Sequence, residues 1–130
     1  MRLLLDTHVF IWLLGNPSRV ENRALDAVRD VENQLFVSAI SPFEISTKHR
    51  IGKLAEGERV LAGYDDFVKT LGASELAMTG HHGIVAGGLK WSHRDPFDRI
   101  LAAQSVTESM TLVTSDAAFD DVAGVRTLWA

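Results

Sequence analysis

Short apolar runs alternate with helix-like segments along the whole chain, and this alternation restricts the choice of fold more than any other feature. The pattern is typical of a parallel β-sheet whose two faces are both covered by helices. The predicted strands are Arg2–Leu5, Leu35–Ser38, Ser74–Met78, Thr111–Thr114 and Val125–Trp129. No repeat, linker or low-complexity tract interrupts the pattern, so we expect one α/β domain over residues 1–130.

Capping and turn residues predict where the helices begin and end. A mostly apolar helix over Thr7–Leu14 should stop at the Gly15-Asn16-Pro17 segment, and Ser18 is expected to cap the next helix. Amphipathic spacing predicts one helix between residues 58 and 71, and a further helix is expected over residues 81–89. These helices would cover the faces of the sheet.

Two later segments share one helix-start pattern, an N-cap residue followed by Pro and, two positions on, an acid. In Ser41-Pro42-Phe43-Glu44, Ser41 is the expected N-cap and Glu44 would complete a capping box. In Asp95-Pro96-Phe97-Asp98, Asp95 is the expected cap and Pro96 the first helical residue. Both acids are therefore predicted to lie in the first turn of a helix.

Composition excludes several classes of function. The chain has no cysteine, so disulfides, thiolate zinc sites and cysteine nucleophiles are ruled out. Its formal net charge of −4 argues against a simple nucleic-acid-binding module, but not against a nuclease whose carboxylates hold metal ions. The longest apolar run is too short for a bilayer span of about 20 residues, and no secretory signal is recognisable. We therefore expect a cytoplasmic protein.

Four carboxylates are predicted to meet at one edge of the sheet. Asp6 and Asp116 follow predicted strands, whereas Glu44 and Asp98 begin helices at the same edge, where open parallel sheets bind ligands. Clustered carboxylates repel one another unless a cation neutralises them, and Mg²⁺ prefers oxygen ligands. Such ions can activate water and stabilise the leaving oxygen of a phosphodiester. Taken singly, each acid could instead serve only as a helix cap or turn residue.

The motifs around these acids resemble those of the PIN-domain ribonucleases, in particular the VapC toxins of type II toxin–antitoxin systems. The resemblance rests on Leu3-Leu4-Leu5-Asp6-Thr7-His8, Ser41-Pro42-Phe43-Glu44, His93-Arg94-Asp95-Pro96-Phe97-Asp98-Arg99-Ile100-Leu101-Ala102-Ala103-Gln104 and Thr114-Ser115-Asp116. It spans nearly the whole chain. The resemblance implies a three-layer α/β/α fold with a mostly parallel sheet of four to five strands.

The same resemblance implies an activity and partners. It implies a Mg²⁺- or Mn²⁺-dependent endoribonuclease, an antitoxin of the VapB kind that inserts a segment near the active site, and a homodimer or toxin–antitoxin hetero-oligomer. Asp6, Glu44, Asp98 and Asp116 take the catalytic, metal-binding positions, with Asp6 and Asp98 first among the ligands. Asp120 would be at most an outer carboxylate. The RNA that is cleaved stays open.

Other residues leave alternatives open. Asp95 is expected mainly to cap its helix, and His93 to have a packing or surface role rather than to touch substrate. Arg99 could bind phosphate or pair with a nearby acid, and Trp12 is expected in the core, with a partner groove as the alternative. Among rival functions, a dehalogenase-like phosphatase would need an acid where His8 stands, and a receiver domain would need a lysine after a later strand. An inactive PIN-like interaction or RNA-binding module remains the main alternative.

Overall fold

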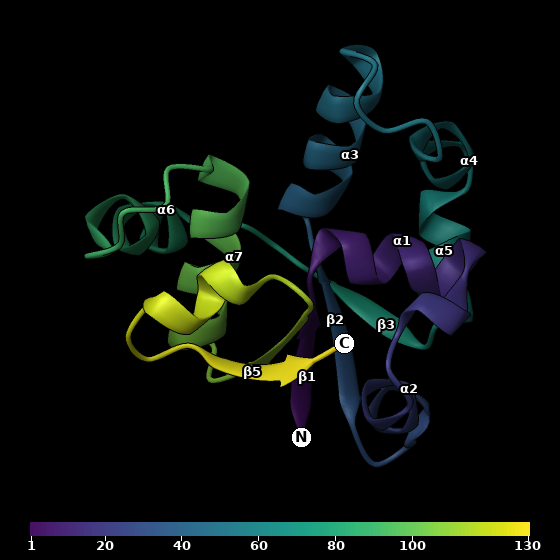
Figure 1. Ribbon diagram of the computed structural model, residues 1–130, viewed down its shortest axis with the longest axis horizontal. Helices are drawn as coiled ribbons and strands as arrows, with labels where there is room; N and C mark the ends of the chain where they lie inside the picture. The colour runs from purple at the N-terminus through teal and green to yellow at the C-terminus, as the bar shows by residue number, and fades with distance from the viewer.

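The computed structural model describes residues 1–130 as a five-stranded parallel sheet between two layers of helices (Figure 1). The strands β1 (Arg2–Leu5), β2 (Gln34–Ser38), β3 (Ala73–Leu76), β4 (Thr111–Thr114) and β5 (Arg126–Trp129) lie in the order β3-β2-β1-β4-β5. The helices are α1 (Thr7–Gly15), α2 (Asn22–Arg29), α3 (Ile40–Arg50), α4 (Gly57–Ala62), α5 (Tyr64–Thr70), α6 (Gly80–Gly88) and α7 (Pro96–Thr107). This three-layer α/β/α architecture confirms the predicted fold class.

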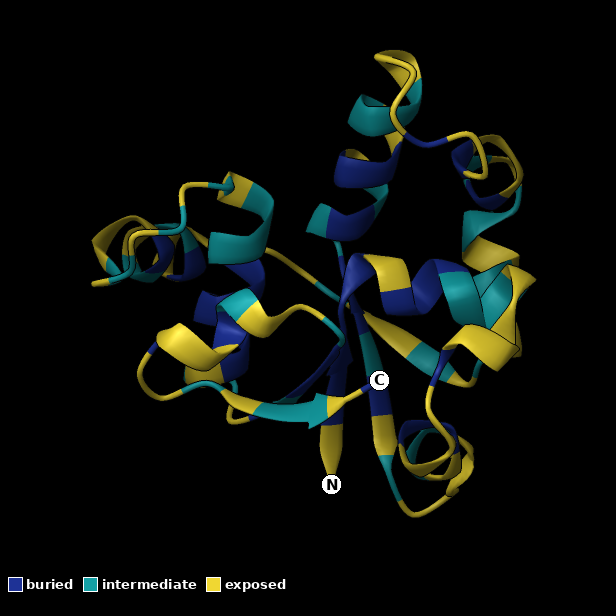
Figure 2. Cartoon of the chain, in the orientation of Figure 1, coloured by how far each residue is buried: buried dark blue, intermediate teal, exposed yellow.

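The central strand β1 is buried on both faces, which explains its run of three leucines. Leu3 and Leu5 pack with α1, α2, α4 and α5 on one side, whereas Leu4 packs against α7 on the other. All three side chains are fully buried, and β1 is dark blue beyond its exposed first residue in Figure 2. A strand covered on both faces has no polar face to alternate with, and so its sequence is a continuous apolar run.

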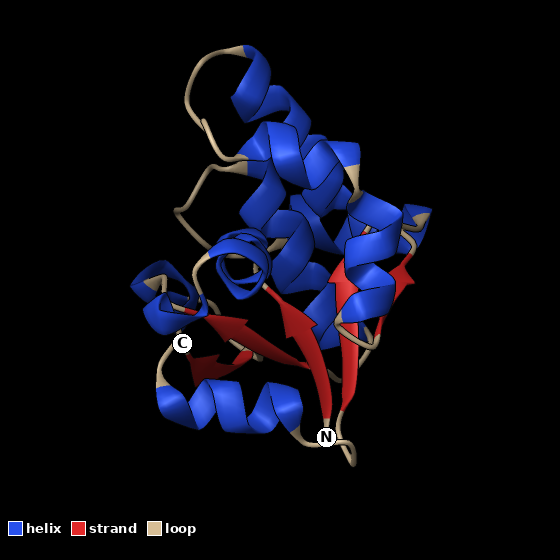
Figure 3. Ribbon diagram, turned by 90° about the vertical axis from the view of Figure 1, so that its right-hand side faces the viewer, coloured by secondary structure: helices blue, strands red, loops and turns tan.

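The carboxyl ends of the strands point to the same edge of the sheet (Figure 3). From β1 the chain moves to β2 and β3 on one side, and then returns to β4 on the other side of β1. The direction of winding therefore reverses between β1 and β4, which is where doubly wound sheets form a crevice beyond the strand ends. This topology brings the segments after β1, β2 and β4 together.

The predicted start of the second helix is wrong. Residues Pro17–Arg19 form a short 3₁₀ turn, η1, and α2 begins only at Asn22. The Ser18 hydroxyl donates to the side chain of Asn16 at 2.6 Å and therefore caps no helix. The buried residues of α2 are Ala24 and Leu25, whereas Val31 lies beyond the helix and is exposed.

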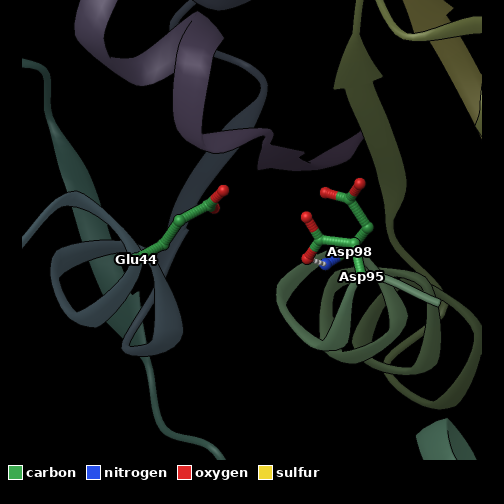
Figure 4. A group of neighbouring side chains, drawn as sticks. All are labelled: Glu44, Asp95 and Asp98. Carbon is green, nitrogen blue, oxygen red and sulfur yellow. Dashed lines mark hydrogen bonds between the residues drawn. The ribbon is translucent and has the colours of Figure 1, made fainter. Parts of the chain in front are cut away.

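The predicted capping box at Ser41 is also wrong. Helix α3 begins at Ile40, whose backbone N–H donates to the Ser38 hydroxyl at 3.1 Å, so the strand itself supplies the acceptor for the first turn. The Ser41 hydroxyl is buried 2.9 Å from the Thr7 hydroxyl. Glu44 therefore lies one turn inside the helix, where its carboxylate has no capping role and extends from α3 toward α7 (Figure 4).

The amphipathic segment predicted as one helix over residues 58–71 is divided at Gly63 into α4 and α5. Gly63 has a non-helical backbone, with φ −128° and ψ 24°. The ring of Phe67 packs over it so closely that a Cβ at this position would lie 3.1 Å from the ring. Both short helices still bury the apolar residues that suggested them, Val60 and Val68. None of the helices has the length and apolar character needed to cross a bilayer.

Candidate functional site

A polar pocket of about 490 Å³ lies at the crevice between β1 and β4, beyond the carboxyl ends of the strands. Its walls contain all four of the predicted site carboxylates. It is lined by Asp6, His8, Trp12, Glu44, Lys48, His93, Asp95, Asp98, Ser115, Asp116 and Ala117. Segments from both ends of the chain thus contribute carboxylates to one cavity.

Asp6 is fixed by a neighbouring strand. Its side chain is buried and accepts a 2.7 Å hydrogen bond from the Thr114 hydroxyl, which in turn accepts one of 3.0 Å from the backbone N–H of Asp116. Burial raises the pKa of Asp6, and the charge of Glu44 raises it further, although the hydrogen bond from Thr114 opposes the shift. Thr114 therefore orients Asp6 and anchors the segment that carries Asp116.

Glu44 is nearly inaccessible to solvent, and only one of its oxygens is satisfied. Its Oε2 forms an ion pair with Lys48 one turn later on α3, whereas its buried Oε1 has no hydrogen-bond partner. Burial opposes protonation of Lys48, but the hydrogen bond and the charge of Glu44 raise the lysine pKa above its ordinary value. A buried carboxylate oxygen without a partner is costly, so this atom is suited to accept a cation or a hydrogen-bond donor.

Helix α7 contributes two acids from its N-terminal end. As predicted, Asp95 caps the helix, because its Oδ1 accepts from the N–H groups of Phe97 at 2.8 Å and Asp98 at 3.2 Å. Figure 4 shows Glu44 extending from α3 toward these two acids, with the bond from the Asp98 amide to Asp95 dashed. The N-terminus of the helix favours negative charge at this position.

Asp98 is a carboxylate whose charge the site strongly disfavours. Burial raises its pKa to about 7, and the charges of Asp95, Asp6 and Glu44 add to the shift. His93 opposes it through a 2.6 Å hydrogen bond between its Nε2 and Asp98 Oδ2. Burial first, and repulsion by the neighbouring acids second, therefore favour the protonated form of Asp98.

These groups fit a hard divalent cation. Carboxylate oxygens of Glu44, Asp95 and Asp98 lie within 4.8 Å of one another, and Asp6 and Asp116 line the same cavity. A divalent cation held by these carboxylates would satisfy the unpartnered Oε1 of Glu44 and offset the repulsion that raises the pKa of Asp98. Asp95 belongs to this cluster as well as capping its helix, a dual role that helix-start chemistry alone does not reveal.

Arg99 does not pair with a nearby acid, which was one of the two roles considered from the sequence. Its guanidinium donates to four backbone carbonyls, those of Ala86 at 3.0 Å, Leu89 at 2.7 Å, and Trp91 and His93 at 2.9 Å each. It therefore forms no ion pair with an acid, and four of its five N–H groups are already used by backbone carbonyls. Instead it ties the loop between α6 and α7 to the first turn of α7, and this loop carries His93 to the site.

The other candidates divide between the rim of the pocket and the rest of the molecule. Asp116 is exposed at the rim and caps the 3₁₀ turn η2 (Ala117–Asp121) by accepting from the Ala118 N–H at 2.9 Å. Asp120 lies in that turn and does not line the pocket. Trp12, which was expected in the core, is only half-buried and lines the pocket, whereas Phe10 is fully buried. Lys48 was not singled out from the sequence, although its position four residues after Glu44 is the spacing of a helical ion pair.

Comparison with known proteins gives consistent matches over nearly the full length. Residues 3–125 match the model of the PIN domain. The chain is 32% identical over 124 residues to ribonuclease VapC22 of Mycobacterium tuberculosis, an alignment that covers 88% of this chain and 86% of that protein.

Solved structures show the same fold at lower identity. VapBC2 from Rickettsia felis, solved bound to a DNA fragment from its promoter, gives a TM-score of 0.73 at 16% identity and covers 99% of this chain and 98% of that one. VapBC-1 from nontypeable Haemophilus influenzae gives a TM-score of 0.70 at 15% identity, with coverage of 98% and 97%.

Proposed function

This chain belongs to the PIN-domain family, and from that membership we propose that it is a metal-dependent endoribonuclease that acts as the toxin of a toxin–antitoxin pair. The observation that carries the proposal is the convergence of Asp6, Glu44, Asp98 and Asp116 on one pocket. The similarity to ribonuclease VapC22 supports RNA as the substrate. A binding module would have no use for buried carboxylates whose mutual repulsion destabilises the fold.

Asp6, Glu44, Asp98 and Asp116 are the residues that would hold Mg²⁺ or Mn²⁺, with Asp95 contributing from the cap of α7. The bound ion would supply an activated water and charge stabilisation for the leaving oxygen of the phosphodiester. Thr114 holds Asp6 in one orientation, and His93 does the same for Asp98. Such supporting hydrogen bonds typically account for a factor of about 10–100 in metal affinity or activity.

Lys48 provides the positive charge that balances the Glu44 carboxylate in this structure. Its ammonium pairs with Glu44, the charges of Asp95 and Asp98 also act on it, and its side chain is partly exposed. A divalent cation at the carboxylates would replace this ion pair and free the ammonium for the negatively charged substrate. The lysine therefore reduces the repulsion within the cluster.

Incubation of the purified, antitoxin-free chain with total cellular RNA tests the activity. We expect discrete fragments with Mg²⁺ or Mn²⁺ and none with EDTA, because the carboxylates alone provide neither an activated water nor a positive charge at the scissile phosphate. Fragments that persist in EDTA would exclude a metal-dependent mechanism. Absence of cleavage, together with a melting temperature unaffected by either metal, would favour an inactive module, since an ion that binds only the native state stabilises it.

The proposed partner is a small antitoxin, as in the VapBC complexes that share this fold. We expect the product of the neighbouring gene to co-purify with this chain and to suppress its RNA cleavage at a one-to-one ratio. A homodimer or a toxin–antitoxin hetero-oligomer is the expected assembly, measurable by light scattering with and without the partner. A gene whose expression arrests no growth and whose neighbours do not inhibit the purified chain would contradict the toxin proposal.

A further inference from the structure

Trp12 connects the carboxylate pocket to a second cavity. It lines the polar pocket described above and also a neighbouring pocket of about 340 Å³. The second pocket is lined by Ile11, Trp12, Gly15, Asn16, Arg19, Glu56 and Arg59. The two cavities therefore adjoin along the exposed side of α1, where this helix passes from the site toward α4 (Figure 1).

The second pocket contains two arginines without anionic partners. Arg19 places its guanidinium carbon 4.4 Å from the centre of the Trp12 ring, and that of Arg59 lies 5.7 Å from the centre of the Phe67 ring. Both arginines are exposed, and neither forms an ion pair or a side-chain hydrogen bond, although Glu56 lines the same pocket. Stacking holds the cations in place and leaves their N–H groups available.

The Trp12 ring has an aromatic neighbour toward the carboxylates. His8 lies one helical turn earlier on α1, exposed, with its ring centroid 6.2 Å from that of Trp12. Proceeding from the carboxylates, the surface thus presents His8, then Trp12, then Arg19 and Arg59. Aromatic rings followed by cations are the combination that binds single-stranded nucleic acid, through base stacking and phosphate contacts.

An RNA substrate would need cationic contacts outside the acidic pocket. An acidic pocket in a chain of net charge −4 repels a polyanion, so an RNA substrate needs cationic contacts outside the pocket. Lys48 is the only lysine or arginine that lines the pocket, so even when a metal ion releases it from Glu44 the pocket offers RNA a single ammonium. The adjoining cavity contains Arg19 and Arg59, which have no ion-pair partner. An RNA chain that extends from the carboxylate pocket along α1 would pass these two arginines.

We propose that the surface formed by His8, Trp12, Arg19 and Arg59 binds the single-stranded RNA segment that flanks the scissile phosphate. A base stacks on Trp12 and the following phosphates contact the two arginines. This assignment rests on the proposed ribonuclease function and adds to it a substrate-binding subsite. A peptide partner would satisfy the arginines only through acidic side chains, whereas RNA supplies anions and planar bases together.

The test measures binding separately from cleavage. A fluorescein-labelled single-stranded RNA 20-mer of mixed sequence is titrated with the full chain in EDTA, and fluorescence anisotropy gives Kd over a series of salt concentrations. We expect the Arg19→Gln, Arg59→Gln double variant to raise Kd at least tenfold. The plot of log association constant against log salt concentration should also become less steep, by about 1.4, because two phosphate contacts are lost. Trp12→Leu should raise Kd about tenfold through lost stacking, and Trp12→Phe should restore most of it.

The matched control is Arg23→Gln, Arg29→Gln, which removes the same charge from positions on α2 outside both pockets. If the two double variants had the same Kd and salt slope, the proposed subsite would be wrong. RNA cleavage by the wild-type protein would still support the proposed ribonuclease function. Wild-type protein that neither binds nor cleaves RNA would overturn both. If the Arg19, Arg59 variant bound RNA normally but no longer bound the antitoxin, the surface would belong to the protein partner instead.

Discussion

Replacing Asp98 by Asn should abolish RNA cleavage and at the same time leave the metal-free protein as stable as the wild type or more stable. The amide has the shape of the carboxylate but is a much weaker ligand for a divalent ion, so we expect activity to fall more than about 100-fold, beyond the range typical of supporting residues. Burial and three neighbouring acids already disfavour the Asp98 charge, as its pKa of about 7 shows. Removing that charge relieves repulsion, and the Asn side chain can still accept the hydrogen bond from His93.

Two measurements on the same samples check this prediction: fragment formation with Mg²⁺ or Mn²⁺, and melting temperature in EDTA at a pH one unit above the Asp98 pKa, where the wild-type carboxyl is mostly charged. Asp26→Asn is the matched control, because Asp26 is exposed on α2 and lines no part of the site. It should leave both cleavage and melting unchanged. Cleavage by Asp98→Asn at the wild-type rate would remove Asp98 from the proposed metal site.

Replacing Arg99 by Met should destabilise the fold more than any substitution among the pocket residues. Four carbonyls would lose their donor, and a hydrogen bond to a charged group typically has a net contribution of roughly 1.5–3 kcal/mol to stability, although such contributions are not additive. Solvent can satisfy part of the loop, so we expect a net loss of about 3 kcal/mol, or a fall of roughly 10 °C in melting temperature. His93 would lose its fixed position and Asp98 its donor, so cleavage should fall as well.

Arg23→Met controls for loss of an exposed arginine and should melt like the wild type. Arg99→Lys keeps the charge but cannot present a planar fork to four acceptors, so it should be intermediate in both stability and activity. If Arg99→Met and Arg23→Met melted at the same temperature, the carbonyl contacts would be incidental to the fold. Should Arg99→Met not fold well enough to assay, the lysine variant still reports on His93 through its rate at saturating substrate.

The sequence predicted those features that depend on local patterns. Three consecutive leucines identify a strand buried on both faces, and Asp95-Pro96 marks the start of α7 because a capping carboxylate and a proline act within one helical turn. The meeting of Asp6 and Glu44 followed from the rule that parallel strands end at one edge of the sheet. Each of these inferences needs only neighbours in sequence or the direction of a strand.

The errors arose where distant contacts decide the structure. Ser41 has the character of an N-cap, but Thr7 lies against its hydroxyl and Ser38 supplies the acceptor for the helix start instead. The break at Gly63 depends on the ring of Phe67, and the role of Arg99 depends on a loop whose conformation has no signature in the sequence. The spacing of apolar residues predicts which side chains are buried. It does not predict which hydrogen-bond acceptor or aromatic ring from a distant segment will contact them.

The position of β1 at the centre of the sheet has a consequence for synthesis of the protein on the ribosome. Asp6 is made among the first residues, yet the hydroxyl that orients it belongs to Thr114, and the β4 backbone that flanks it comes from the same late segment. At a translation rate of about 5–20 residues per second, Thr114 is synthesised roughly 5–20 s after Asp6. A nascent chain therefore has an incomplete cluster of acids until most of its length has been translated, and prematurely terminated chains ending before β4 should be harmless to the cell that makes them.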